Sequence, residues 1–521
     1  MANYRIGKII QKQIMDFTKQ LDRSRFGTLL ERSGMDSKPH QHEGVAWCID
    51  RELAPNEYGG VRGGIMADEM GLGKTIQMLG VVLCNFKRRT LIILPKSLMC
   101  QWVAAIKSTL GHDPLVYHGP GASGLAEARV ASAPIVVSTY GMLRKDLPLS
   151  KISWDRVIFD EAHHLRNNDT DKQKNAIKLK SKIMWFVTGT PIQNRESDLY
   201  SLFKVMKIPE QVYSFNIAGK DKKKAPNYDI VRKMKRALII KRTKKTANLE
   251  LPATSNHEIV VDWKNDEERN VAEEIHGILF SGLMDRKNRF TPPWERYALP
   301  FICFSKQMCT APKSMARHVG KLTGQESVDG TELRDPNASD GLINAALENN
   351  SKIDRATEEI IARKDNGRLK LVFVEYRLEM ETVRRRLVKN GITVGEINGA
   401  TSASARKAIL ANIPSTSTST STKYVLLLQI KVGCEGLNLQ EFSEVYFLSP
   451  NWNPAVEDQA VARCHRIGQK VPVDIFRFSM EGFGRDTHSI DNYITERQNE
   501  KRKVMVNSDQ CCDLTNPTTQ A

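Results

Sequence analysis

Residues 68–75 of the chain are Asp68-Glu69-Met70-Gly71-Leu72-Gly73-Lys74-Thr75, and they predict the fold. Its Gly-Lys-Thr ending supplies what a nucleoside triphosphate needs: glycines that let backbone N–H groups approach the phosphates, a lysine for the β and γ oxygens, and a hydroxyl for magnesium. A helix that begins here adds the positive end of its dipole. A strict P-loop has glycine where this chain has Asp68, so a glycine-rich turn before an ordinary helix is the alternative.

A second feature decides between these alternatives. The apolar run Val157-Ile158-Phe159 leads directly into Asp160 and Glu161, as in the Walker B arrangement. We expect Asp160 to hold magnesium, and Glu161 to orient and deprotonate the attacking water. An acidic pair after a strand is common by itself. Several strand–helix alternations away from Lys74 in one sheet, the pair predicts an ATP site.

Short apolar runs alternate with helix-like segments along most of the chain, which is typical of parallel βαβ units. We expect strands at 90–94, 134–138, 156–159 and 183–187, and again at 370–374, 423–428 and 445–448, with a helix at 377–388. This pattern predicts an α/β fold with two RecA-like parallel-sheet lobes, helical insertions between them and ATP in the intervening cleft. Ligands are expected at the carboxyl ends of the strands.

The expected domains follow from this alternation. They are an N-terminal extension (1–37), a first RecA-like lobe (38–255), a helical protrusion or linker (256–350), and a second lobe with a C-terminal brace helix (351–521). The Ser/Thr repeat at 414–422 cannot pack, and we expect a surface loop there.

Two arginines in the second half are candidates for the same reaction. The sequence from Gln459 to Gln469 predicts a helix, in which Arg463 and Arg466 project from one face because they are i and i+3 neighbours. Phosphoryl transfer needs positive charge on the developing oxygens, and an inserted arginine contributes roughly 10³ to 10⁵ in rate. Arginines on a second lobe would make hydrolysis depend on closure of the cleft. A solvated basic helix is the alternative.

Composition narrows the class of partner. Lys and Arg number 77 against 60 Asp and Glu, a formal charge of +17, which favours a polyanionic partner such as nucleic acid. A basic enzyme with no such partner is the alternative. The nine cysteines are scattered without a C-x-x-C pair, so we expect neither zinc nor a disulfide framework. We also expect no membrane partner, because no apolar run approaches the roughly 20 residues needed to span a bilayer.

With these residues in hand, the sequence resembles the Swi/Snf (Snf-two type) family of DNA-dependent ATPases, in helicase superfamily two, from Lys38 to Val504. Segment 38–47 is similar to the family's adenine-reading motif, and 68–75 matches its P-loop variant, Asp68 included. The resemblance implies that Gln41 contacts the base, that 68–75 bind ATP, and that Thr75 and Asp160 hold magnesium. The residues within these motifs are most similar to those of the RING-bearing repair translocases, although the RING cysteines are not found in this sequence.

Further motifs of the family occur in its order. Thr188 to Asn194 resembles the motif that couples ATP to DNA grip, and the resemblance implies coupling roles for Gly189, Thr190, Gln193 and Gly436. Other segments resemble further motifs of both lobes, most of which face DNA. They are 94–97 with Gln101-Trp102, 138–140, 241–244, 398–402 and 451–454. The resemblance implies that DNA is contacted by Lys96, Thr139, Arg242, Thr401 and Trp452.

The resemblance implies an ATP-dependent translocase on double-stranded DNA that remodels nucleosomes or other protein–DNA complexes. A monomeric motor in the nucleus is expected, with a viral or bacterial setting as the alternative. A strand-separating DNA or RNA helicase is the second hypothesis, since Asp-Glu-Ala-His also names an RNA-helicase group. The third is a binding module without turnover, against which the intact Lys74, Asp160, Glu161, Arg463 and Arg466 argue.

Overall fold

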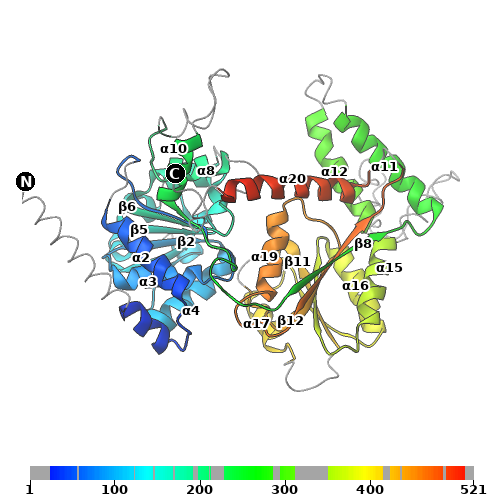
Figure 1. Ribbon diagram of the computed structural model, residues 1–521, viewed down its shortest axis with the longest axis horizontal. Helices are drawn as coiled ribbons and strands as arrows, with labels where there is room; N and C mark the ends of the chain where they lie inside the picture. The colour runs from blue at the N-terminus through cyan, green and yellow to red at the C-terminus, as the bar shows by residue number, and fades with distance from the viewer. Residues whose placement is uncertain are drawn as a thin grey trace, which may run out of the picture. The chain divides into compact units, whose positions relative to one another are not determined.

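The computed structural model describes most of the chain, in two compact units that are each considered by themselves. The described residues are 24–54, 58–122, 124–144, 147–167, 170–191, 197–210, 212, 228–284, 294–310, 350–414, 423–433, 437–484 and 488–510. One unit runs from Leu251 to Arg502; Met1–Glu250 groups with Lys503–Ala521 in the other. Each unit contains one parallel sheet with helices on both faces (Figure 1).

The sheet of the first unit has seven strands in the order β3-β4-β2-β5-β6-β1-β7, and all of its neighbouring pairs are parallel. The strands are β1 (Arg62–Met66), β2 (Thr90–Leu94), β3 (Leu115–Tyr117), β4 (Ile135–Thr139), β5 (Ser153–Asp160), β6 (Lys180–Val187) and β7 (Ile239–Ile240). The four strands expected in this part of the chain are confirmed. β1 was not expected, because two glycines interrupt its apolar run. Gly63 is required there, since a Cβ would lie 2.0 Å from the carbonyl oxygen of Met184.

Successive residues of these strands pack against two helical layers. Leu91 and Ile93 of β2 face one core, whereas Ile92 and Leu94 face the other. The second of these cores also contains residues of α2 (Pro39–Leu53), α3 (Lys74–Cys84) and α4 (Met99–Leu110) (Figure 1). The first core contains residues of α5 (Glu127–Ser132), α6 (Pro148–Lys151), α7 (Asp171–Lys178), α8 (Ser197–Val205) and α10 (Tyr228–Leu238). Burial on both faces explains why these strands are apolar throughout.

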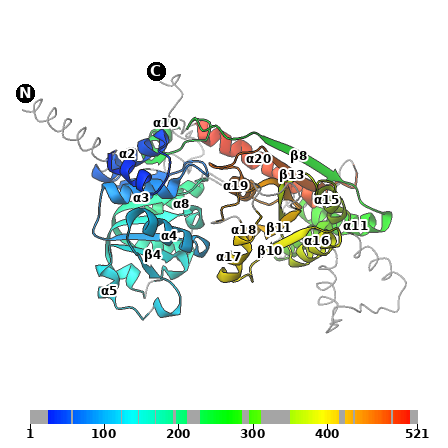
Figure 2. The same ribbon diagram turned by 90° about the horizontal axis from the view of Figure 1, so that it is seen from below.

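The second unit has a six-stranded parallel sheet in the order β10-β11-β9-β12-β13-β8. Its strands are β8 (Thr254–Val261), β9 (Leu369–Val374), β10 (Thr393–Ile397), β11 (Tyr424–Gln429), β12 (Phe442–Phe447) and β13 (Val473–Met480). One core includes residues of α11 (Asp266–Met284), α12 (Trp294–Thr310), α15 (Ser351–Ala362), α16 (Arg377–Lys389) and α20 (Ile490–Gln510). The other includes residues of α18 (Ile430–Gly433) and α19 (Pro454–Cys464), with α17 (Ala403–Ala411) packed against it (Figure 2). The predicted α/β class is therefore confirmed.

The segment expected to be helical from residue 256 begins instead with a strand. β8 pairs in parallel with β13 along its full length, at the edge of the second sheet. Only Val261 of β8 is buried, so the strand keeps a polar sequence that hides it from an analysis of apolar runs. The first lobe was expected to end at residue 255, inside β8, whereas the structural division falls before Leu251. The two helices α11 and α12 then pack against one another.

Within the described ranges, no helix has both the length and the apolar character needed to cross a bilayer.

Candidate nucleotide site and arginine turn

The glycine-rich loop connects β1 to the first turn of α3. Gly71 and Gly73 have φ angles of 94° and 79°, in the left-handed region that residues with a Cβ disfavour, and Gly73 is the N-cap of α3. Lys74 begins the helix, and its Nζ lies 2.8 Å from the carbonyl oxygen of Asp68 and 3.4 Å from that of Glu69. Glycines, helix N-terminus and lysine thus form the cradle that a polyphosphate requires.

The acidic pair Asp160 and Glu161 lies at the same edge of the sheet. Asp160 ends β5 and pairs in register with Val187 of β6, which pairs with Met66 at the end of β1. These three strand ends place the carboxylates beside the P-loop, as parallel strands of equal register must. The positive charge of Lys74 acts on Asp160. The two halves of the predicted ATP site therefore meet.

The Asp160 carboxylate is held on both oxygens. Oδ1 accepts the backbone N–H of Glu161 at 2.9 Å, and Oδ2 accepts the indole N–H of Trp102 at 2.6 Å. Burial, together with the charge of Glu161, raises the pKa of Asp160 to about 6. Glu161 itself has a φ of 48°, and its Oε2 lies 3.2 Å from Nδ1 of His163. A cation bound beside this buried carboxylate would favour its ionised form, so the site suits a cation.

Asp68, the departure from a strict P-loop, has a specific partner. Its buried Oδ1 accepts from the backbone N–H of Arg242 at 3.1 Å and from the Arg242 Nε at 3.0 Å, while Oδ2 accepts from Gln77 at 3.1 Å. Because β7 pairs with β1, the residues after β7 run beside the loop. Glu69 is held there too, since its carboxylate accepts the backbone N–H of Lys244 at 2.8 Å. Asp68, the acidic residue that replaces the usual glycine of the loop, is thus paired with the basic residue Arg242.

This pairing corrects one expectation. Arg242 was expected to contact DNA, but its guanidinium donates to Asp68, Gln77 and the carbonyl oxygen of His40, and its side chain is only 10% exposed. We reassign Arg242 to the support of the P-loop. A run of basic residues gives no sign in the sequence of which of its members turns inward.

The predicted base-contacting residue also lies at the loop. Gln41, on α2, is buried, and a Cβ on Gly73 would come 2.5 Å from its amide nitrogen. Its neighbour His40 lies with Nε2 3.1 Å from the carbonyl oxygen of Leu72. The Gln41 Oε1 has no hydrogen-bond partner among the described residues. An unpaired buried amide oxygen is the acceptor that an adenine amino group needs.

The start of the expected coupling motif packs on the P-loop. A Cβ on Gly189 would lie 2.8 Å from Met70 Cε and 3.6 Å from Lys74 Nζ, so only glycine fits here without a shift. Thr190 follows, its N–H donating to Thr188 Oγ1 at 3.2 Å. Gln193 and Gly436, the other expected coupling residues, lie outside the described residues.

The four remaining expected DNA contacts differ in exposure. Lys96, just after β2, is exposed, and Trp452 is 42% exposed, with Lys501 Nζ 5.5 Å from the centre of its ring. Thr139 is buried and its hydroxyl lies 3.2 Å from His118. Thr401 accepts the backbone N–H of Asn398 at 2.9 Å and so closes a turn. A contact with DNA stays a prediction for all four.

The two arginines of the second unit were expected on one helix, but the structure places them on different elements. α19 ends at Cys464, so Arg463 lies in its last turn whereas Arg466 belongs to the turn that follows. Burial, with a smaller effect of Arg463, lowers the pKa of Arg466. Just beyond the end of this helix, the amide group of Gln469 donates to the carbonyl oxygens of Gln440 (2.9 Å), Phe442 (3.1 Å) and Cys464 (3.3 Å). We call residues 465–472 the arginine turn.

The arginine turn also lies at an unexpected edge of its sheet. It connects α19 to the first residue of β13, and Gln469 binds the residues at the start of β12, so the turn is at the edge where the strands begin. Arg466 is therefore not at the carboxyl ends of the strands, where ligands are expected. The reason is that α19 runs back across the sheet before the motif is complete.

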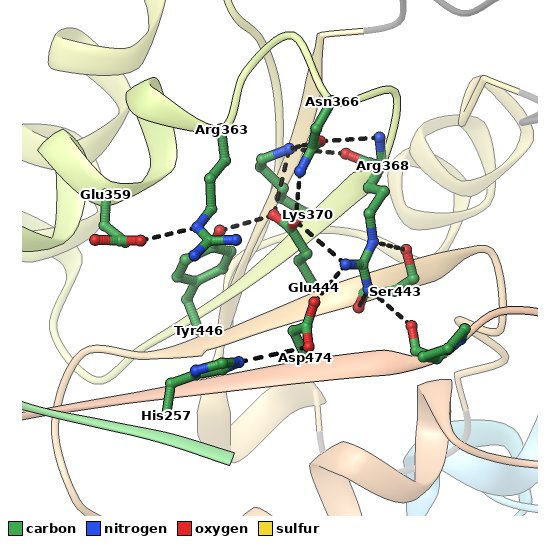
Figure 3. Close-up of polar contacts among 11 residues, drawn as sticks. His257, Glu359, Arg363, Asn366, Arg368, Lys370, Ser443, Glu444, Tyr446 and Asp474 are labelled. Atoms are coloured by element: carbon green, nitrogen blue, oxygen red, sulfur yellow. Dashed lines mark hydrogen bonds and ion pairs between the residues drawn. The ribbon is translucent and has the colours of Figure 1, made fainter. Parts of the chain in front are cut away.

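A polar network joins the residues at this edge, with Lys370 and Glu444 buried and Arg368 28% exposed (Figure 3). Arg368 donates to the carbonyl oxygens of Ser443 (2.6 Å) and Pro472 (2.7 Å) and pairs with Asp474. Beneath it, Lys370 pairs with the fully buried Glu444, at 3.4 Å. The network thus joins the end of the arginine turn to β9, β12 and β13.

Three residues of these sites could not be assigned a role from the sequence: Trp102, Arg368 and Gln469. Trp102 and Gln469 stand within the motifs that carry the family resemblance, but no pattern says which groups they bind. Arg368 belongs to no motif. In the ranges that the structure covers, no three His, Cys, Asp or Glu side chains converge as a metal site.

A phosphate cradle at the head of a helix, with an acidic pair at a neighbouring strand end, defines a P-loop nucleotide hydrolase. Comparison with known families is decisive on the particular kind. The SNF2-related domain matches residues 40–313, and the helicase conserved C-terminal domain matches residues 351–468. The chain belongs to the SNF2-related family and is an ATP hydrolase of the helicase-like class. The predicted family and enzyme class are confirmed.

Similar proteins come from bacteria, viruses and archaea. An uncharacterized ATP-dependent helicase of Mycoplasma pneumoniae is 27% identical over 92% of this chain, which spans 43% of that protein. A probable global transactivator of Orgyia pseudotsugata multicapsid polyhedrosis virus is 27% identical over 89% of each chain. The SWI2/SNF2 ATPase core of Sulfolobus solfataricus, solved in complex with double-stranded DNA, has 22% identity, a TM-score of 0.39, and coverage of 90% of this chain and 92% of that one.

Proposed function

We propose that the chain is an ATP-driven motor that translocates along double-stranded DNA and remodels nucleosomes or other protein–DNA complexes. The observation that carries the proposal is the register of β5, β6 and β1, which brings Asp160 and Glu161 to the P-loop. The family membership and the formal charge of +17 support DNA as the polyanion. The expected setting is the nucleus, with a virus or a bacterium as the alternative.

The residues at the loop fit ATP with magnesium. In the proposal, the amide N–H groups of residues 71–75 bind the phosphates, Lys74 neutralises them, and Gln41 reads the adenine. Thr75 and Asp160 would hold magnesium, which supplies charge stabilisation to the transferring phosphoryl group when bound. The buried Asp160 and the Gln41 Oε1, which has no hydrogen-bond partner in the part of the chain that the structure describes, support this assignment.

Hydrolysis requires a base and positive charge. We assign the base to Glu161, whose carboxylate lies at the end of β5 near His163. Arg463 and Arg466 are assigned to the charge that develops on the phosphoryl oxygens. Because they belong to the second unit, hydrolysis would depend on the conformation that both units adopt together, which is how a chemical step produces movement.

The link to DNA is assigned to residues of both units. Gly189 and Thr190 pack on or near the P-loop and are proposed to report the state of the nucleotide. Lys96, Thr139, Thr401 and Trp452 are proposed contacts to the DNA backbone. Binding led by phosphate contacts should weaken steeply with salt, with a slope of about 0.9 per neutralised phosphate, and show little sequence preference.

The test is ATPase activity measured side by side with duplex DNA, single-stranded DNA, RNA and nucleosomes, together with displacement of a triplex-forming strand. Duplex DNA should stimulate hydrolysis most and the third strand should be displaced without unwinding of a forked duplex. Unwinding of the fork would favour the strand-separating helicase instead. No stimulation by duplex DNA would contradict the proposal. The E161Q variant is the control, since it should bind ATP and not hydrolyse it.

A further inference from the structure

The Asp160 carboxylate receives a hydrogen bond from a tryptophan far away in sequence. Trp102, on α4, is 1% exposed, and its Nε1 donates to Asp160 Oδ2 at 2.6 Å. A short bond from a neutral donor to a carboxylate is charge-assisted and directional. It fixes the rotation of the carboxyl group and so decides which lone pairs remain for a cation.

A second aromatic side chain holds the same residue by its backbone. The Tyr140 hydroxyl donates to the carbonyl oxygen of Asp160 at 2.7 Å, and its ring stacks near Phe159 with centroids 6.4 Å apart. Asp160 is therefore fixed at its side chain and at its main chain by two separate elements.

The segment that leads into each of these two aromatic residues carries a proposed DNA contact. Lys96 begins a short 3-10 helix, Lys96–Leu98, that continues directly into α4 and Trp102. Thr139 ends β4 immediately before Tyr140. If these segments shift when they bind a phosphate backbone, the side chains of Trp102 and Tyr140 would transmit the shift to Asp160. A packed and hydrogen-bonded connection of this kind is the physical route that coupling requires.

We infer that Trp102 is a positioning residue for Asp160, and that Trp102 and Tyr140 together connect the DNA-contacting segments of the first unit to the magnesium site. The inference rests on the proposed function, since it uses its assignments of Asp160, Lys96 and Thr139. It adds a regulatory connection that the motifs alone do not contain.

The experiment replaces Trp102 by phenylalanine, which keeps an aromatic ring and removes the indole N–H. The matched control is W185F: Trp185 is also fully buried, and its Nε1 donates at 2.8 Å to Glu52, a carboxylate of the same unit. Melting temperatures of both variants establish that they fold. The main measurement is binding of a fluorescent ATP analogue as a function of magnesium, in an E161Q background that blocks turnover.

We expect W102F to raise the magnesium concentration at half-saturation, and to lower kcat by about 10- to 100-fold in the Glu161 background, the usual effect of removing a group that orients a metal ligand. The KM for ATP at saturating magnesium should change little, because the hydrogen bond that W102F removes is the one to Asp160. W185F should leave the magnesium dependence as it is. An unshifted magnesium dependence in folded W102F would overturn the positioning role.

The DNA arm separates this inference from the proposed function. In the wild type, duplex DNA should lower the magnesium half-saturation, and in W102F and Y140F this effect should shrink while DNA affinity stays the same. A wild type that ignores DNA would refute the proposed function and the DNA connection, but the magnesium shift of W102F would still support the positioning role. An undiminished DNA effect in both variants would refute the connection alone.

Discussion

Arg242 donates to the buried carboxylate of Asp68, a residue 174 positions earlier in the chain, with Nε 3.0 Å from Oδ1. The pair joins the segment after β7 to the P-loop, and Gln77 of α3 binds both partners. Each acidic residue at the start of the loop thus has a basic partner from the same segment, since Glu69 also pairs with Lys244 at 3.5 Å. These contacts between the P-loop and the segment after β7 stabilise the loop.

The first prediction concerns this pair. R242A should raise the KM for ATP at least tenfold and destabilise the first unit by about 3–5 kcal/mol, because it leaves a buried carboxylate without its counter-charge. The double variant D68N/R242A should recover part of the stability, since the charge is then absent. Equilibrium nucleotide binding and thermal unfolding measure the two effects. The control is K245A, at an exposed position of the same segment; equal effects in K245A and R242A would contradict the role.

The second prediction concerns Arg463, in the last turn of α19, and Arg466, in the arginine turn. R466A and R463A should each lower kcat by about 10³-fold or more while ATP still binds, because the charge is needed as the phosphoryl group transfers. Single-turnover hydrolysis and equilibrium binding of a nucleotide analogue distinguish these quantities. R385A serves as the control, since the Arg385 side chain is 71% exposed on α16. Weakened ATP binding with an unchanged rate would assign the arginines to ground-state binding instead.

The third prediction concerns the network of Figure 3. K370M should destabilise the second unit by about 3–5 kcal/mol, because Glu444 then keeps a buried charge without its closest lysine. Adding E444Q should recover most of the loss. Thermal unfolding followed by circular dichroism is the measurement, with K389A on α16 as an exposed control. A single variant as stable as the wild type would show that Arg368 alone neutralises Glu444.

The fourth prediction is a pH dependence of stability. Glu379 of α16 is buried, and its Oε2 accepts the backbone N–H groups of Glu375 (2.8 Å) and Tyr376 (3.0 Å). Burial raises its pKa from 4.5 to about 7. The folded protein therefore holds a proton that the unfolded chain releases between these values, and the contribution of Glu379 to stability falls as pH rises through this window.

The variant E379Q keeps an oxygen acceptor and removes the titration. Relative to the wild type, its melting temperature should rise between pH 5 and pH 8 by a few degrees, since about 1 kcal/mol corresponds to roughly 2–4 °C for a unit of this size. Differential scanning fluorimetry across this range is sufficient. E381Q, at a side chain 45% exposed on the same helix, should show no such trend. A constant difference between E379Q and the wild type would mean that Glu379 stays ionised throughout.

The residue types of the proposed nucleotide site can be recognised from the sequence alone. Gly71, Gly73, Lys74, Asp160 and Glu161 are recognisable because a phosphate cradle and a strand-end acidic pair need those residue types at local spacings. The buried strands were equally visible, since burial on both faces leaves runs of apolar residues. β8 was not, because an edge strand that is mostly exposed keeps a polar sequence.

The partners of the polar residues depend instead on how the chain folds in three dimensions. Arg242 and Lys245 are alike in sequence, yet one is turned toward Asp68 by the pairing of β7 with β1 and the other is exposed. Trp102 donates to Asp160, and Gln469 donates to the carbonyl oxygens of Gln440 and Phe442, because hydrogen bonds between residues distant in the chain depend on how the strands are ordered, which no local pattern encodes. Local spacing specifies chemical groups, whereas long-range packing specifies what each group can reach.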